Sequence, residues 1–145
     1  MAIAERSAEC TWKGSLAHGN GVVSGGSGAL SELAVTWASR TERSTGQTSP
    51  EELIAAAHAS CFSMALSHEL SQAGNEPEQL DVSARVTLDE RDGAPTITTS
   101  ELTVSGRVPG IDQEAFTKAA TNAGRQCPVS RALGGVEISV SATLD

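Results

Sequence analysis

Residues Thr48–Ser67 read TSPEELIAAAHASCFSMALS, and this stretch predicts the long helix around which the fold is built. Ser49 offers a side-chain oxygen of the kind that caps a helix N-terminus, and Pro50 fits the first helical position. Glu51 and Glu52 then lie at the positive end of the helix dipole, where carboxylates are stabilising. The sequence therefore predicts that a helix starts here.

The body of this helix is apolar or small on nearly every side, and Gly74 marks its expected end. A helix of this kind is enclosed on most of its faces. A chain of 145 residues has few other elements that could enclose it. We therefore expect a second subunit to cover one side of the helix, which makes the protein a homodimer. The apolar or small residues are Leu53, Ile54, Ala55, Ala56, Ala57, Ala59, Cys61, Phe62, Met64, Ala65 and Leu66.

Patterns of alternating apolar and polar residues on both sides of the helix predict strands. In chain order we expect strands over 8–12 and 33–37 separated by turns over 19–28, then the helix, hairpin strands over 82–88 and 102–108, a helix over 112–126, and a last strand over 136–144. This order predicts an α+β fold with antiparallel sheets. Because no linker-like stretch divides the chain, a single domain over 1–145 is expected.

The charge of the chain argues against two classes of partner. Ten Lys and Arg against eighteen Asp and Glu give a formal net charge of −8, which opposes binding to nucleic acid and to anionic membranes. The uncharged stretch Leu53–His68 is shorter than the roughly 20 residues that span a bilayer. The charged N-terminus, with Glu5 and Arg6, does not resemble a secretory signal, so we expect a cytoplasmic protein.

The three cysteines are far apart in sequence, which makes a structural disulfide framework improbable and leaves redox chemistry or burial. Cys10 shares a predicted strand face with Trp12 and fits a buried packing role. Cys61 lies on the central helix, where burial alone would raise the pKa of its thiol, so a reactive Cys61 needs a cation nearby. Cys127 precedes Pro128 and a short helical run, where helix N–H groups would favour a thiolate.

A metal site is a weaker interpretation of the same helix. His58, Cys61 and His68 lie near one helix face, as three ligands of a metal would. No further ligand pair accompanies them, whereas a structural zinc normally takes four ligands. Metal binding therefore remains an alternative.

The strings TSPEELIAAAHASCFSMALS at Thr48–Ser67 and CPVS at Cys127–Ser130 closely resemble the two cysteine-bearing motifs of the OsmC/Ohr family, more the OsmC branch than the Ohr branch. The order of predicted elements also resembles that family over essentially the whole chain. The resemblance implies an intertwined homodimer with active sites at the interface and no cofactor. It further implies peroxidase activity toward organic hydroperoxides, more weakly toward hydrogen peroxide, with a dithiol reductant such as a lipoylated protein.

The resemblance implies roles for four residues of this chain. Cys61 matches the peroxidatic cysteine and Cys127 the resolving cysteine, so that a Cys61 sulfenic acid would condense to a Cys61–Cys127 disulfide. Arg40 matches the arginine that stabilises the thiolate, although Arg43 is close enough to compete. Glu51 matches the acid that would hold this arginine in a bidentate pair.

The neighbours of Cys61 carry an expectation about substrate. Apolar side chains here, among them Phe62, Met64 and Leu66, are expected to line the site and to favour alkyl or lipid hydroperoxides over hydrated hydrogen peroxide.

Helix geometry sets a constraint on the site. Ten residues separate Glu51 from Cys61, which corresponds to roughly 15 Å along a straight helix. One unbroken helix can hardly bring both side chains to one thiol. We therefore expect the Arg and Glu that serve a given Cys61 to come wholly or partly from the partner subunit, unless the helix is broken between Glu51 and Cys61. Two other functions remain open, a redox-sensing or stress-binding dimer without efficient turnover and a metal-binding or purely structural dimer.

Overall fold

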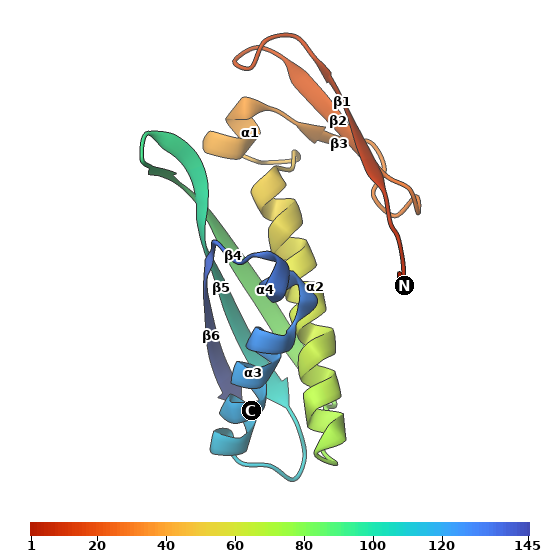
Figure 1. Ribbon diagram of the computed structural model, residues 1–145, viewed down its shortest axis with the longest axis vertical. Helices are drawn as coiled ribbons and strands as arrows, with labels where there is room; N and C mark the ends of the chain where they lie inside the picture. The colour runs from red at the N-terminus through yellow and green to blue at the C-terminus, as the bar shows by residue number, and fades with distance from the viewer. The chain divides into compact units, whose positions relative to one another are not determined.

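The computed structural model describes residues 1–145 and falls into two compact units, Met1–Leu53 and Ile54–Asp145 (Figure 1). We describe each unit by itself, and the single domain expected from the sequence stays a prediction. The long helix α2, Pro50–Gln72, begins in the first unit and continues without a break through the second. None of the helices combines the length and apolarity that a membrane-spanning helix needs.

The first unit is a three-stranded antiparallel sheet followed by a short helix. Its strands are β1 (Ala8–Lys13), β2 (Asn20–Gly25) and β3 (Leu33–Val35), in the order β1-β2-β3, and helix α1 spans Trp37–Thr41. We expected turns over 19–28, but residues Asn20–Gly25 of this segment form strand β2. Gly21 on β2 allows side chains of the two neighbouring strands to pack closely against its backbone, because a Cβ at this position would lie 2.8 Å from Val35 and 2.9 Å from Trp12.

Two further expectations for this unit were wrong. Trp37 does not extend the strand but opens α1, because Thr36 and Ser39 form a reciprocal capping box that starts a helix at this point. Cys10 is exposed and not buried, because all of β1, an edge strand of this sheet, is exposed in the single chain.

The ends of α2 are those that the sequence predicts. The Ser49 hydroxyl accepts a hydrogen bond from the backbone N–H of Glu52 at 3.1 Å, as a helix cap does. At the other end Gly74 adopts φ +84°, and the N–H of Asn75 donates to the carbonyl of Leu70 at 2.8 Å. These contacts form a Schellman motif, which satisfies the last carbonyl groups of the helix.

The second unit packs helices against a three-stranded sheet. Strands β4 (Gln79–Arg91) and β5 (Ala94–Arg107) form an antiparallel hairpin, whose turn has positive φ at Asp92 and Gly93. Helices α3 (Gln113–Gln126) and α4 (Pro128–Ala132) lead to β6 (Glu137–Leu144), which pairs with β5.

The β5–β6 pairing is parallel, which differs from the wholly antiparallel arrangement expected from the sequence. The physical reason is the connection. Helices α3 and α4 carry the chain back along the sheet before β6 begins, and such a helical crossover joins parallel strands. Asp112 caps α3 as predicted, with its side chain accepting from the N–H of Ala115 at 2.8 Å.

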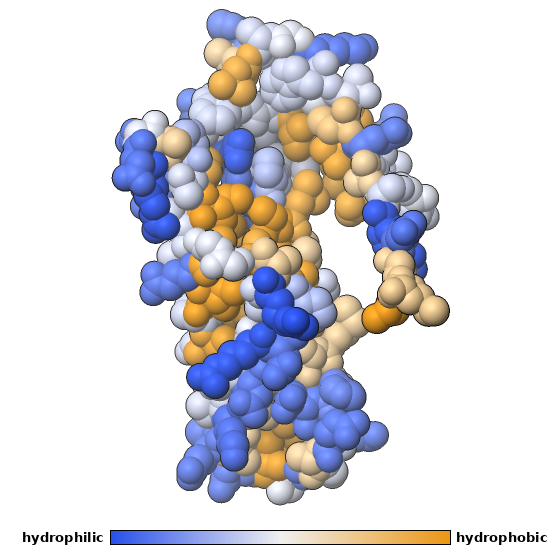
Figure 2. Space-filling view, viewed as in Figure 1, coloured by the Kyte–Doolittle hydropathy of each residue, from blue (hydrophilic) through white to orange (hydrophobic).

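One hydrophobic core holds this unit together. It combines side chains of α2, β5 and α3. The outer surface of the molecule at α3 is mainly hydrophilic (Figure 2). From α2 it takes residues at every fourth position, so the single chain buries one face of this helix, while Ala57, Ser60 and Met64 stay exposed. The buried core residues are Phe62, Leu66, Leu70, Leu102, Val104, Val108, Phe116, Ala120, Ala123 and Cys127.

Candidate active site

The structure brings Cys61 and Cys127 together in the second unit. Cys61 lies on α2 and is partly buried, and Cys127 is fully buried between α3 and α4. Both are free thiols, and Cys61 packs against the core cluster to which Cys127 belongs. The Cys127 thiol is close enough to act directly on the ionisation of Cys61. The fold therefore places two thiols that are distant in sequence side by side.

The surroundings of Cys61 within this chain oppose a thiolate. Burial raises the pKa of the Cys61 thiol, and the adjacent Cys127 thiol raises the pKa further. The backbone N–H of Val129, in the first turn of α4, acts in the opposite direction and lowers it. No arginine is among the groups that shift this pKa, so the chain's own second unit supplies one favourable N–H and no cation.

The expected role of the α4 N-terminus needs a correction. Cys127 does stand at the N-cap of α4, with Pro128 in the first helical position, but its side chain makes no capping hydrogen bond. The backbone of Cys127 also closes α3, since its N–H donates to the carbonyl of Ala123 at 2.9 Å. An N–H of α4 therefore serves Cys61 on the facing helix and not Cys127.

The expected pair of Arg40 and Glu51 lies in the first unit and is bidentate. Arg40 Nε donates to Glu51 Oε1 at 2.9 Å, and Arg40 Nη2 donates to Glu51 Oε2 at 2.9 Å. The guanidinium of Arg40 also lies over the ring of Trp37, 5.9 Å from the ring centroid. Arg43 is exposed, so the geometry favours Arg40 over Arg43 as the arginine held in place. These contacts hold the guanidinium while leaving Nη1 outside the pair.

The segment that presents Arg40 is fixed by its own hydrogen bonds. The buried hydroxyl of Ser39 donates to the carbonyl of Thr48 at 2.8 Å, which ties α1 to the residues just before α2. Thr48 in turn donates from its hydroxyl to Glu52 Oε1 at 2.6 Å. Arg40 and Glu51 therefore belong to one connected local structure.

His58 is buried and engaged on both ring nitrogens. Its Nδ1 lies 2.6 Å from the hydroxyl of Ser100, and its Nε2 lies 2.8 Å from the hydroxyl of Ser130. His58 is therefore not available to a metal together with Cys61 and His68, and no three His, Cys, Asp or Glu side chains are grouped to hold an ion. The metal alternative finds no support in this arrangement.

Acid should destabilise the protein through His58. Burial lowers the pKa of His58 from its ordinary value of 6.5, so the native state keeps the ring neutral while the unfolded chain takes up a proton. The free energy of unfolding should therefore fall as the pH drops below about 6.5, by up to about 1.4 kcal/mol per pH unit until the native ring titrates. Urea unfolding between pH 7 and 5 measures this slope, and His58→Gln should flatten it. An unchanged slope in the variant would contradict the assignment.

Three participants in this site were not expected from the sequence. They are the backbone N–H of Val129 and the hydroxyls of Ser100 and Ser130. The expectation that Phe62 and Leu66 line the site was wrong, because both are fully buried in the core, and Met64 is exposed. Helix periodicity explains this result, since Phe62 and Leu66 lie on the face of α2 that is packed against the sheet.

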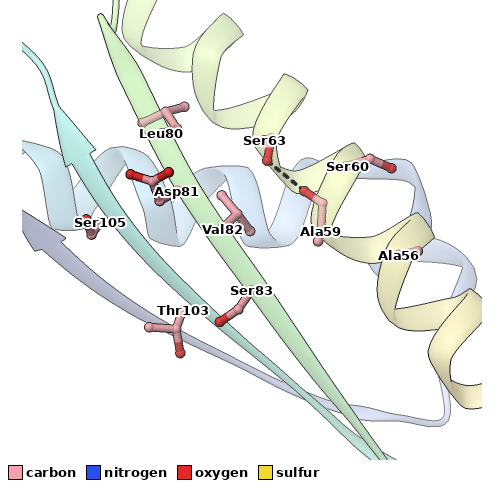
Figure 3. Close-up of a pocket in the computed structure, with 10 residues that line it drawn as sticks. All are labelled: Ala56, Ala59, Ser60, Ser63, Leu80, Asp81, Val82, Ser83, Thr103 and Ser105. Carbon is pink, nitrogen blue, oxygen red and sulfur yellow. Dashed lines mark hydrogen bonds between the residues drawn. The ribbon is translucent and has the colours of Figure 1, made fainter. Parts of the chain in front are cut away.

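A groove lies between α2 and the β4–β5 hairpin (Figure 3). It has a cavity volume of about 650 Å³, and the α2 side chains that line it are small, with Ser63 donating to the carbonyl of Ala59 at 2.7 Å. Neither cysteine lines it. Its lining residues are Ala56, Ala59, Ser60, Ser63, Leu80, Asp81, Val82, Ser83, Thr103 and Ser105.

The fold and the site together define an α+β protein with two adjacent thiols on the core of a helix-covered sheet. The chain belongs to the OsmC-like protein family, whose model matches residues 43–141. It is 44% identical over 122 residues to Peroxiredoxin OsmC of Escherichia coli (strain K12), which covers 84% of this chain and 85% of that protein.

Solved structures agree with this membership. The organic hydroperoxide resistance protein OhrB of Bacillus subtilis aligns with TM-score 0.70 and 25% identity, over 94% of this chain and 98% of that chain. An organic hydroperoxide resistance protein OsmC of Legionella pneumophila aligns with TM-score 0.73 and 23% identity, over 99% of each chain, and this likeness speaks for the fold.

Proposed function

We propose that this protein is a thiol-dependent peroxidase that reduces organic hydroperoxides, and hydrogen peroxide more weakly. The observation that carries the proposal is the adjacency of Cys61 and Cys127, one thiol partly accessible and the other fully buried. Membership of the OsmC-like family, a relative named as a peroxiredoxin and another named for organic hydroperoxide resistance support the same chemistry.

The proposed reaction uses both thiols in sequence. The Cys61 thiolate attacks the O–O bond of the hydroperoxide, the alkoxide leaves and takes up a proton to give the alcohol, and Cys61 becomes a sulfenic acid. The Cys127 thiol then attacks the Cys61 sulfur and expels water, which forms the Cys61–Cys127 disulfide. A dithiol, such as the dihydrolipoyl group of a lipoylated protein, reduces the disulfide to two thiols and is itself oxidised.

The raised pKa of Cys61 requires a cation that the second unit does not supply. We propose that Arg40 of a second subunit fills this role in an intertwined homodimer, with Glu51 of that subunit holding the guanidinium. The unbroken α2 supports this arrangement, because Glu51 and Cys61 stand ten residues apart on one continuous helix. The exposed face of α2 supports the dimer, since a second subunit would bury it. A cytoplasmic location stays a prediction.

A coupled assay tests the proposal. Purified protein is mixed with cumene hydroperoxide and dihydrolipoamide, and the loss of hydroperoxide is followed over many turnovers. Sustained consumption that scales with protein concentration is the expected result. Consumption of about one equivalent followed by a stop would contradict the proposed turnover with a dithiol.

The same raised pKa favours a second candidate function. If no cation reaches Cys61, the thiol reacts slowly and the pair serves as a redox sensor that closes a disulfide without efficient turnover. Slow consumption of a single equivalent, with disulfide formation and no further turnover, is the outcome that distinguishes this sensor from the enzyme.

Removing the second thiol should stop the cycle after its first step. In Cys127→Ser the first equivalent of hydroperoxide should still be consumed, and the Cys61 sulfenic acid should accumulate because no thiol condenses with it. Mass spectrometry of the dimedone-labelled protein detects this state. Full multiple-turnover activity in Cys127→Ser, at the wild-type rate, would show that Cys127 does not resolve the intermediate.

A further inference from the structure

Three buried side chains form a polar chain through the core of the second unit. Ser100 on β5 contacts His58 on α2, which contacts Ser130 on α4, with distances of 2.6 and 2.8 Å. His58 and Ser100 are fully buried, and Ser130 is 8% exposed. Because each serine hydroxyl both donates and accepts, a neutral imidazole satisfies both contacts in either tautomer. The chain of contacts therefore joins three elements without burying a charge.

This polar chain ends on the two segments that carry the thiols. His58 precedes Cys61 by one turn of α2, so the same helix segment holds the imidazole and the partly exposed thiol. Ser130 follows Cys127 by three residues and Val129 by one. The contact between His58 and Ser130 therefore fixes α4 to α2 at the place where Val129 and Cys127 face Cys61.

A cavity lies beside α4 at Ser130. It has a volume of about 450 Å³, and Gly124 and Val140 also line it. The helix itself has only five residues, Pro128–Ala132, and a helix of this length is barely stable on its own hydrogen bonds. Packing against the core therefore does not enclose Ser130 fully, and the contact with His58 adds a directional constraint on the position of α4.

We propose that His58 is a positioning residue that holds α4 through Ser130, so that the Val129 N–H and the Cys127 thiol stay directed at Cys61. The consequence for disulfide closure rests on the proposed peroxidase function, whereas the consequence for Cys61 ionisation does not. Loss of the contact frees α4, removes the N–H that stabilises the thiolate, and moves Cys127 away from the sulfur it must attack.

Two serine variants separate positioning from general stability. Ser130→Ala and Ser100→Ala each remove one hydroxyl and leave one ring nitrogen of His58 unpaired, but only Ser130→Ala cuts the contact with α4. The first measurement is the pH profile of Cys61 alkylation by iodoacetamide, read by mass spectrometry of the Cys61 peptide. The second is the rate of Cys61–Cys127 disulfide formation after one equivalent of cumene hydroperoxide. Thermal unfolding confirms that each variant is folded.

In Ser130→Ala we expect the alkylation midpoint to rise by about one pH unit and disulfide formation to slow about tenfold, as loss of a hydrogen bond to a charged group predicts. Ser100→Ala should leave the alkylation midpoint nearly unchanged and the rate of disulfide formation within about twofold of wild type, because the contact with α4 remains. Ser130→Thr, whose methyl group has the cavity beside it, should restore wild-type behaviour. Equal effects in the two alanine variants, or no rescue by threonine, would overturn the proposal. If the wild type forms no disulfide with hydroperoxide, the peroxidase function fails while the alkylation profiles still decide the positioning role.

Discussion

Replacing Cys61 with serine is expected to reduce hydroperoxide turnover by at least about a thousandfold, because a serine hydroxyl has no anionic form at neutral pH to attack the O–O bond. The hydroxyl is close in size to the thiol and Cys61 is only partly buried, so the fold should survive the change. The coupled assay with cumene hydroperoxide and dihydrolipoamide measures the loss.

Cys10→Ser is the matched control for this experiment. Cys10 is exposed on β1, and neither of its chain neighbours belongs to the candidate site. Cys10→Ser should therefore keep turnover within about twofold of wild type. Activity largely kept in Cys61→Ser would mean that Cys61 is a packing residue, and the peroxidase proposal would fail with it.

Much of the fold could be predicted because the deciding signals are local. The cap at Ser49, the Schellman end at Gly74 and the hairpin turn at Asp92 each depend on residues that are neighbours in sequence. Strand β2 was not predicted, because glycines suggested a turn, whereas Gly21 lies in a strand where side chains of other strands approach its backbone closely. The parallel pairing of β6 was also not predicted, because it depends on where α3 and α4 return the chain.

The same distinction between local and long-range signals applies to the residues of the candidate site. Cys61 and Cys127 could be named from two motifs, and the Arg40–Glu51 pair spans 11 positions in a segment that the resemblance covers. The contacts of His58 span 42 and 72 positions and end on serines, which carry no motif of their own. Pattern in a single sequence cannot connect such residues, because the sheet register and the position of α4 bring them together.

Replacing Arg40 with alanine should lower peroxidase turnover about a hundredfold, because the pKa of Cys61 is raised by burial and the guanidinium is the cation proposed to offset it. Arg40→Lys should recover only part of this loss, since an ammonium cannot form the bidentate pair with Glu51. Arg43→Ala is the matched control and should retain activity, because Arg43 is exposed. A large loss in Arg43→Ala with little loss in Arg40→Ala would reverse the assignment.

Co-expression of two inactive variants tests where Arg40 acts. One subunit carries Arg40→Ala with an intact Cys61, and the other carries Cys61→Ser with an intact Arg40, each with a different affinity tag. If Arg40 serves the partner's thiol, the mixed dimer contains one complete site, made of Cys61 from the first subunit and Arg40 from the second. Random assembly should then restore about a quarter of wild-type activity, because half of the dimers are mixed and one of their two sites is intact.

An arginine that served the thiol of its own chain would give a different result. Each site of the mixed dimer would then lack either the thiol or the guanidinium, and activity would stay at the level of the separate variants. Purification through both tags in turn isolates the mixed dimer and raises the expected activity to about half of wild type. The measurement therefore distinguishes the two arrangements by a restored activity, which a general loss of folding in either variant cannot imitate. Restoration would also establish the dimer as the catalytic unit, since two defective chains can complete one site only when they share it.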